Sequence, residues 1–165
     1  MDLFIEKIIQ KKKSIGDYLF ITGIIILALV LIYILPVLIR SVALLADVGV
    51  LYAAYKLIRS RNKEYEYALT NGEIDIDVII DRKKRKRIFT ANCKEFEILE
   101  KINGSHYSQY AGKMTKIIKA VSSMKAEDIY YFVLYREKDR IMVYFEPDPK
   151  MINAFKTYIP SKVFE

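Results

Sequence analysis

The sequence predicts an α+β membrane protein in which a transmembrane helical hairpin precedes a barrel or sandwich of about seven antiparallel strands with a C-terminal capping helix. Two observations lead to this fold class. Residues 18–39 form an uncharged run of 22 residues, and a second apolar run follows at 41–58. After residue 58 the apolar side chains recur at every second position, which is the period of half-buried strands.

The overall composition conceals this division. The chain has 165 residues, 53% of them hydrophobic and 28% charged, with 27 Lys and Arg against 20 Asp and Glu. Between the start of the first apolar run and the end of the second, the charged residues are Arg40, Asp47 and Lys56. A single cysteine, Cys93, and a single histidine, His106, leave little material for disulfides, zinc sites or His-based catalysis. We therefore expect no catalytic residues, no metal site and no cofactor, and a reducing compartment.

Residues 1–16 form a basic N-terminal segment with an amphipathic pattern. Its apolar side chains are those of Leu3, Phe4, Ile5, Ile8 and Ile9. Polar residues and a run of three lysines at 11–13 accompany them. We interpret the pattern as a helix that lies in the membrane interface before the chain enters the bilayer.

Residues 17–58 are predicted to contain two transmembrane helices, at about 18–39 and 41–58. The first run is about 33 Å long as a helix, which matches the roughly 30 Å hydrocarbon core of a bilayer. A signal peptide is the less favoured interpretation, because the run is too long and no small-residue cleavage site follows it. Pro36 and Arg40 lie where the first helix should end. The second run is then just long enough for a return pass.

Basic residues on both flanks predict the orientation, because Lys and Arg are retained on the cytosolic side of a membrane. They lie before the first helix and after the second, whereas the turn between the helices holds Arg40 alone. The flanking residues are Lys7, Lys11, Lys12, Lys13, Lys56, Arg59, Arg61 and Lys63. We expect a multi-pass protein of the cell membrane with two spans and with cytosolic N and C termini.

Residues 59–165 have the pattern of a strand-rich domain. Asn71-Gly72 between two alternating runs is a strong hairpin signal. Asp148 and Pro149 supply an N-cap and a first-turn proline for a helix at about 149–159. The predicted strands are 65–70, 73–80, 87–93, 96–102, 116–122, 129–136 and 140–145, and residues 105–114 are predicted to form a loop or lid.

The opening of this domain, Tyr65-Glu-Tyr-Ala-Leu-Thr-Asn-Gly72, resembles the opening of bacterial PH-like domains, which often follow a pair of transmembrane helices. Seven strands followed by a helix are also the element order of a PH-like barrel. Together with Glu73-Ile-Asp-Ile-Asp77, the basic run 82–87 and the segment 93–98, the chain resembles an uncharacterised family of small bacterial membrane proteins. The resemblance implies a hairpin followed by a cytosolic PH-like domain, and it implies no activity.

A run of six cations is the first candidate site. Its members are Arg82, Lys83, Lys84, Arg85, Lys86 and Arg87. Anionic headgroups attract such clusters by about 1 kcal/mol per residue, so lipid contact is one interpretation. The other is a solvated turn whose cations pair across the hairpin with Asp75, Asp77 and Asp81. Nucleic acid is not an expected partner, because no pattern of stacking aromatic residues accompanies the run.

Asp47 is the one ionisable residue deep in a predicted span, and such residues are functional candidates by default. It could belong to a proton or ion pathway. It could also lie at a helix–helix or oligomer contact together with Gly49.

The sequence therefore predicts a non-enzymatic integral membrane protein that presents a domain at the cytosolic face for protein–protein interaction or assembly. Its expected partners are the lipid bilayer and a protein partner or a second copy of the chain. The alternative is sensing of anionic lipid or of the membrane surface through residues 82–87. A minor alternative is transport or catalysis that uses Asp47 or His106, each of which the sequence leaves without an obvious companion.

Overall fold

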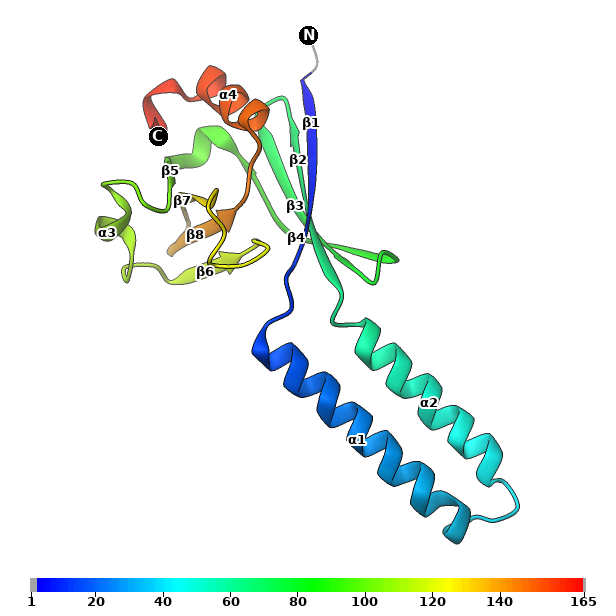
Figure 1. The fold of residues 1–165 in the computed structure, drawn as a ribbon. Coiled ribbons are helices and arrows are strands. Elements are labelled where there is room, and N and C mark those ends of the chain that lie inside the picture. Colours follow the sequence, from blue (N-terminus) through cyan, green and yellow to red (C-terminus); the bar gives the residue numbers. More distant parts are fainter. Residues whose placement is uncertain (1–2, 165) are drawn as a thin grey trace. The chain divides into compact units, whose positions relative to one another are not determined.

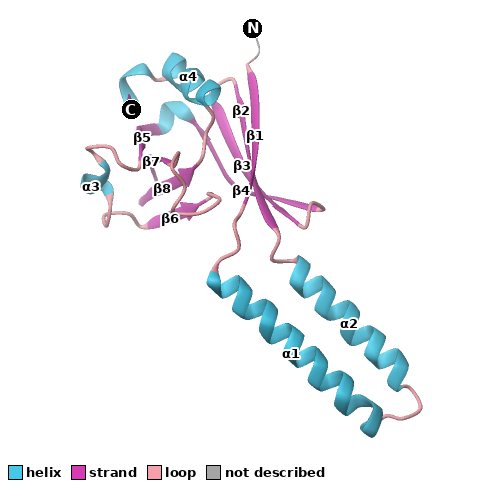
Figure 2. Cartoon of the chain, in the orientation of Figure 1, coloured by secondary structure: helices cyan, strands magenta, loops and turns pink. Residues whose placement is uncertain are grey.

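The computed structural model describes residues 3–164, which divide into two compact units (Figure 1). The helical unit comprises Lys12–Lys63 and Ile80–Lys84. The sheet unit comprises the chain up to Lys11, Glu64–Ile79 and the chain from Arg85 onward. Figure 2 shows that long helices make up the first unit and that strands dominate the second.

The helical unit contains two consecutive helices, α1 (Ile15–Leu38) and α2 (Ala43–Arg59), which pack against each other side by side (Figure 1). α1 starts at a capping box in which Ser14 and Asp17 bind each other's backbone N–H groups. Asp17 and Ala28 are the buried residues of α1, and α2 has none. Among the described residues one helix, α1, is long and apolar enough to cross a membrane.

The sheet unit contains a four-stranded sheet in the order β1-β2-β3-β4. Its strands are β1 (Phe4–Gln10), β2 (Lys63–Thr70), β3 (Glu73–Ile80) and β4 (Lys84–Asn92). Asn71 and Gly72 join β2 to β3 with φ angles of 49° and 87°, the left-handed pair that a tight hairpin turn needs. The hairpin predicted from these two residues is therefore confirmed.

Strand β1 corrects the prediction of an interfacial helix at the N-terminus. Ile5 and Ile9 lie on one face of the strand and pack against the core, while Phe4 and Ile8 on the other face are exposed. A segment this short fits a helical and an alternating pattern equally well, and its partner β2 lies more than fifty residues away in the sequence. The sheet unit thus begins before the helices and not at residue 59.

A second sheet of five strands has the order β6-β8-β7-β5-β9. Its strands are β5 (Phe96–Lys101), β6 (Lys116–Lys119), β7 (Tyr130–Arg136), β8 (Asp139–Phe145) and β9 (Val163–Phe164). The seven predicted strands correspond to β2 through β8, whereas β1 and β9 were not predicted. Two pairings, β6 with β8 and β5 with β9, are parallel, which departs from the all-antiparallel prediction.

Both sheets share one hydrophobic core with helix α4 (Pro149–Tyr158). Phe96 stacks on Phe132 with ring centroids 4.1 Å apart, and Phe155 of α4 packs on Phe96. The Asp148 carboxylate accepts a hydrogen bond from the backbone N–H of Met151 at 2.7 Å. The predicted N-cap and first-turn proline of the C-terminal helix are therefore confirmed.

The other face of the five-stranded sheet has a smaller apolar cluster of its own. A short helix, α3 (Tyr107–Tyr110), lies in the segment predicted as a loop or lid, and Tyr107 packs on Tyr131 and Tyr144. The hydroxyls of Tyr107 and Tyr144 lie 3.0 Å apart. Two short 3₁₀ helices, η1 (Cys93–Glu95) and η2 (Pro160–Lys162), complete the described elements.

Candidate functional site

The chain leaves the four-stranded sheet after β1 and returns to it at β2. These two strands pair antiparallel over seven residues, from Phe4 opposite Thr70 to Gln10 opposite Glu64. The helices α1 and α2 are therefore an insertion into a β-hairpin. Because Gln10 and Glu64 are paired, both connections to the helical segment start from the same end of the same sheet.

Arg59, the last residue of α2, and Arg61, which follows it, make ion pairs where the chain enters and leaves the helical unit. The Arg61 guanidinium lies 3.8 Å from the Asp17 carboxylate and 4.0 Å from the centre of the Phe20 ring. The Arg59 Nε donates to Asp81 at 2.5 Å, and the Asp81 N–H donates to the carbonyl of Asn62 at 2.9 Å. The turn Ile80–Lys84 is thus fixed to the end of α2.

The basic run does not act as one cluster, because the structure divides it between two environments. Arg85 pairs with Glu66, and Arg87 pairs with Asp75 at 2.7 Å and Asp77 at 2.6 Å. Burial raises the pKa of the Glu66 carboxyl, and the charge of Arg85 opposes that increase. These two arginines therefore serve the sheet, as the pairing interpretation predicted for Asp75 and Asp77.

The lysines of the run have a different position. Lys83 lies in the turn that belongs to the helical unit, and Lys84 and Lys86 alternate with the paired arginines along β4. All three are exposed. Asp81, which the pairing interpretation assigned to the run, binds Arg59 instead. The cations of the run that have no carboxylate partner among the described residues and remain candidates for lipid contact are Lys83, Lys84 and Lys86.

Asp47 is the fifth residue of α2 and is half-buried. Its Oδ1 atom is covered and has no hydrogen-bond partner among the described residues.

A buried carboxylate that the sequence did not reveal lies at Glu100 of β5, which is 2% exposed. Its oxygens accept hydrogen bonds from the Tyr131 hydroxyl at 2.7 Å and from the His106 backbone N–H at 3.2 Å, and the His106 Nδ1 lies 3.0 Å away. A Cβ at Gly104 would lie 2.1 Å from the Glu100 Cδ, so only glycine leaves room for this carboxylate. His106 therefore has companions, contrary to the sequence interpretation.

This arrangement fastens the α3 segment to the sheet. Burial on its own would raise the pKa of Glu100, but the hydrogen bonds from Tyr131 and His106 outweigh it and lower that pKa. Burial and the bond to Glu100 raise the pKa of Tyr131. The carboxylate is thus ionised and fully used as an acceptor, which is a structural role. Across residues 3–164, no group of three or more His, Cys, Asp or Glu side chains has a metal-binding arrangement.

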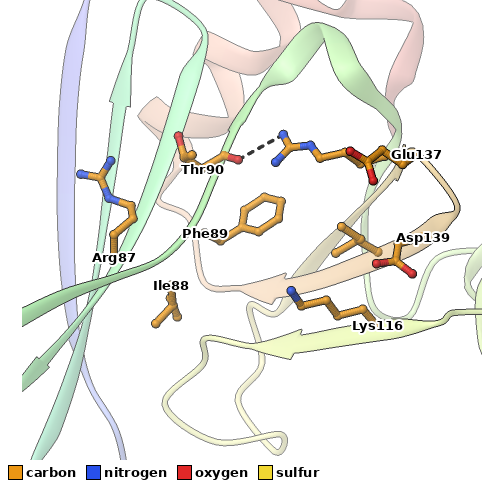
Figure 3. Close-up of a pocket in the computed structure, with 9 residues that line it drawn as sticks. Arg87, Ile88, Phe89, Thr90, Lys116, Glu137 and Asp139 are labelled. Carbon is orange, nitrogen blue, oxygen red and sulfur yellow. Dashed lines mark hydrogen bonds between the residues drawn. The ribbon is translucent and has the colours of Figure 1, made fainter.

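A pocket of mixed charge lies beside β4, the outer strand of its sheet (Figure 3). It has a volume of about 390 Å³ and lies between Arg87–Thr90 on one side and Lys116 and the β7–β8 turn on the other. Phe89 points into it, and the Arg136 side chain donates to the Thr90 carbonyl at 3.3 Å (Figure 3). The walls of the pocket carry both signs of charge, from Arg87, Lys116 and Arg136 and from Glu137 and Asp139.

The family model described as "Bacterial PH-like domain (DUF6106)" matches residues 1–165, which is the whole chain. The chain belongs to this family. The match covers β1 and the helices as well as the strands, so the bacterial PH-like domain includes the inserted helical segment. No curated protein and no solved structure matches the chain. The part of the predicted resemblance that concerns a bacterial PH-like domain is confirmed.

Proposed function

We propose that the protein is a non-enzymatic integral membrane protein whose two-span hairpin presents a PH-like domain at the cytosolic face for protein–protein interaction or assembly. The pairing of β1 with β2 carries this proposal. Both strands belong to one sheet, so both must lie on the same side of the membrane. If α1 crosses the bilayer, the chain must cross again before β2, and α2 is the helix available for the return.

Helix lengths support this assignment. α1 has 24 residues and is about 36 Å long, whereas α2 has 17 residues and is about 26 Å long. The shorter helix is a few ångströms below the usual hydrocarbon thickness, a mismatch that local thinning accommodates at modest cost. Asp47 adds about 2.5–3.5 kcal/mol against insertion, which the pairing with the strongly apolar α1 offsets.

The distribution of basic residues gives the orientation. Lys11–Lys13 precede α1, and Arg59, Arg61 and Lys63 follow α2, while Arg40 lies in the connection between the helices. By the positive-inside rule the two basic flanks stay in the cytosol. The sheet unit is then cytosolic, where the outer strand β4 and its pocket of mixed charge are available to a protein partner.

A pair of engineered cysteines tests the observation that carries the proposal. Glu6 lies opposite Ala68, and the backbone bond between Leu3 and Asn71 places Glu6 and Ala68 at a non-hydrogen-bonded pair, the closer of the two kinds. In a Cys93→Ala background, Glu6→Cys with Ala68→Cys should form a disulfide in native membranes. Glu6→Cys with Thr70→Cys is the control, two residues out of register. Equal oxidation of both pairs would contradict the β1–β2 pairing.

Crosslinking tests the interaction role separately. Treatment of native membranes with an amine-reactive crosslinker should give a discrete product larger than the monomer, either with one reproducible partner or with a second copy. Recovery of the monomer alone at every crosslinker concentration would refute assembly, whatever the topology.

Contact with anionic lipid through the basic turn is a second candidate, because Arg59 and Asp81 hold this turn in the unit that contains the spans. In nanodiscs, acylation of Lys83 and Lys84 should be slower with anionic than with zwitterionic lipid, whereas Lys150 of α4 is the exposed reference. Equal rates in the two lipids would exclude the contact. The full chain is needed, because a fragment that starts at residue 59 lacks β1.

A further inference from the structure

The edge strand β6 carries an exposed basic and apolar surface, of which only Lys116 also lines the pocket beside β4. Its sequence is Lys-Ile-Ile-Lys, and in its sheet it pairs with β8 alone. Ile118 packs against the core, while Lys116 and Lys119 are exposed and Ile117 is 49% exposed. A large apolar side chain thus lies between two cations on an open edge.

The charge of this segment has one sign. Residues 111–126 contain Lys113, Lys116, Lys119 and Lys125 and no acidic residue. Asp139 accepts from the Thr115 hydroxyl at 3.2 Å, and Glu146 accepts from the Ser122 N–H at 2.5 Å. Glu137 and Asp139 line the same pocket as Lys116, so carboxylates lie near one end of the segment. The excess of lysines along residues 111–126 still gives this edge a positive charge that attracts an anionic surface.

The connections between the two units set the distance to such a surface. Residues 11–14 join β1 to α1, and residues 60–62 join α2 to β2. Four extended residues span at most about 14 Å, and the shorter connection spans about 10 Å. A domain on such short connections stays close to the headgroups, within a distance comparable to the Debye length of about 8–10 Å.

We propose that the β6 edge, formed by Lys113 and Lys116–Lys119, docks on anionic lipid headgroups of the membrane in which the chain is anchored. Ile117 enters the boundary between headgroups and acyl chains, and the flanking lysines lie among the phosphates. This inference rests on the proposed membrane anchoring, and it concerns a surface distinct from residues 82–87. A lipid is favoured over a soluble partner because the short connections to α1 and α2 already hold the sheet unit near the membrane. Docking on lipid therefore loses much less translational and rotational freedom than binding a free partner does.

An environment-sensitive fluorophore at position 117 tests the proposal on the full chain in nanodiscs. In a Cys93→Ala background, an NBD label at Ile117→Cys should emit at shorter wavelength in discs that contain phosphatidylglycerol than in discs of phosphatidylcholine alone. Raising the salt concentration should weaken this shift, because the attraction is electrostatic. Lys116→Gln with Lys119→Gln should abolish it.

Matched controls separate docking from net charge. Lys94→Gln with Lys150→Gln removes the same charge elsewhere on the sheet unit and should leave the shift unchanged. A label at Lys150→Cys should not respond to the lipid. The proposal is overturned if the label at position 117 gives the same emission in both lipids, if the two double variants behave alike, or if the α4 label shifts instead. Failure of the chain to enter nanodiscs would refute the anchoring and not the docking alone.

Discussion

The two units of the protein differ in what surrounds their apolar side chains. The sheet unit buries its large residues against one another, with Phe96, Phe132 and Phe155 fully covered. The helical unit leaves most of its large apolar residues exposed, and its buried residues are Asp17 and Ala28. The first unit completes its core by itself, whereas the second needs an apolar solvent. The ion pairs of the helical unit lie where α1 begins and α2 ends, which is where the proposed anchoring would expose them to water and headgroups.

The largest expected effect tests whether the two units differ in this way. Phe96→Ala should destabilise the sheet unit by about 3–5 kcal/mol, because it removes a stacked ring from the core. Leu29→Ala, at a residue that is 62% exposed on α1, should change stability by less than about 0.5 kcal/mol. Chemical denaturation in detergent measures both. Similar losses for the two variants would show that α1 is packed as a soluble core helix is.

The next prediction tests whether the arginines and the lysines of the basic run, residues 82–87, differ in their contribution to stability. Arg87→Ala should cost about 2–3 kcal/mol, because it leaves the buried carboxylate of Asp77 without its partner. Lys86→Ala, one residue away, should be neutral within about 0.5 kcal/mol. Thermal unfolding of the two variants checks the contrast. An equal effect would restore the view of the run as a single functional cluster.

The lowered pKa of Glu100 predicts that the stability of the sheet unit depends on pH. Its pKa is lowered in the folded state, so its contribution is present above the unfolded-state pKa of about 4.3 and is lost as the pH falls through the folded-state value. Glu100→Gln should cost about 1–2 kcal/mol at pH 7 and much less at about pH 3. Denaturation of both proteins across this range measures the difference. A difference independent of pH would show that the carboxylate charge is not what fastens the α3 segment.

The smallest expected effect concerns the base of the helical unit. Arg59→Ala removes the ion pair with Asp81, which is partly exposed and therefore contributes little to global stability. We expect faster hydrogen exchange at residues 80–84 with little change elsewhere. Unchanged exchange in this turn would mean that other contacts hold it.

Much of the fold could be predicted from the sequence, because its signals are local. Asn71-Gly72 and Asp148-Pro149 specify a turn and a helix start through their own backbone preferences, and both are observed. β1 could not be predicted in this way, since its strand character depends on pairing with β2 across the helical insertion. Long-range contacts of this kind have no signature in a short segment.

The contacts of the candidate functional residues could not be predicted from the sequence for the same reason, because they join distant segments of the chain. Six consecutive cations were visible in the sequence, but which of them meet carboxylates depends on strand register and on the turn at 80–84. Glu100, His106 and Tyr131 lie on three separate elements and meet only in the folded sheet unit. Nothing in the sequence shows that the missing side chain of Gly104 leaves the space that the Glu100 carboxylate occupies.

Vectorial labelling of single cysteines tests the central claim, that the helical insertion crosses the membrane twice from a cytosolic β-hairpin. In a Cys93→Ala background, Lys12→Cys, Ser41→Cys and Ser60→Cys are exposed positions before, between and after the helices. An impermeant maleimide added to intact cells should label position 41, and should label positions 12 and 60 only after permeabilisation. Labelling of position 60 but not 12 in intact cells, or no labelling of 41, would contradict the account.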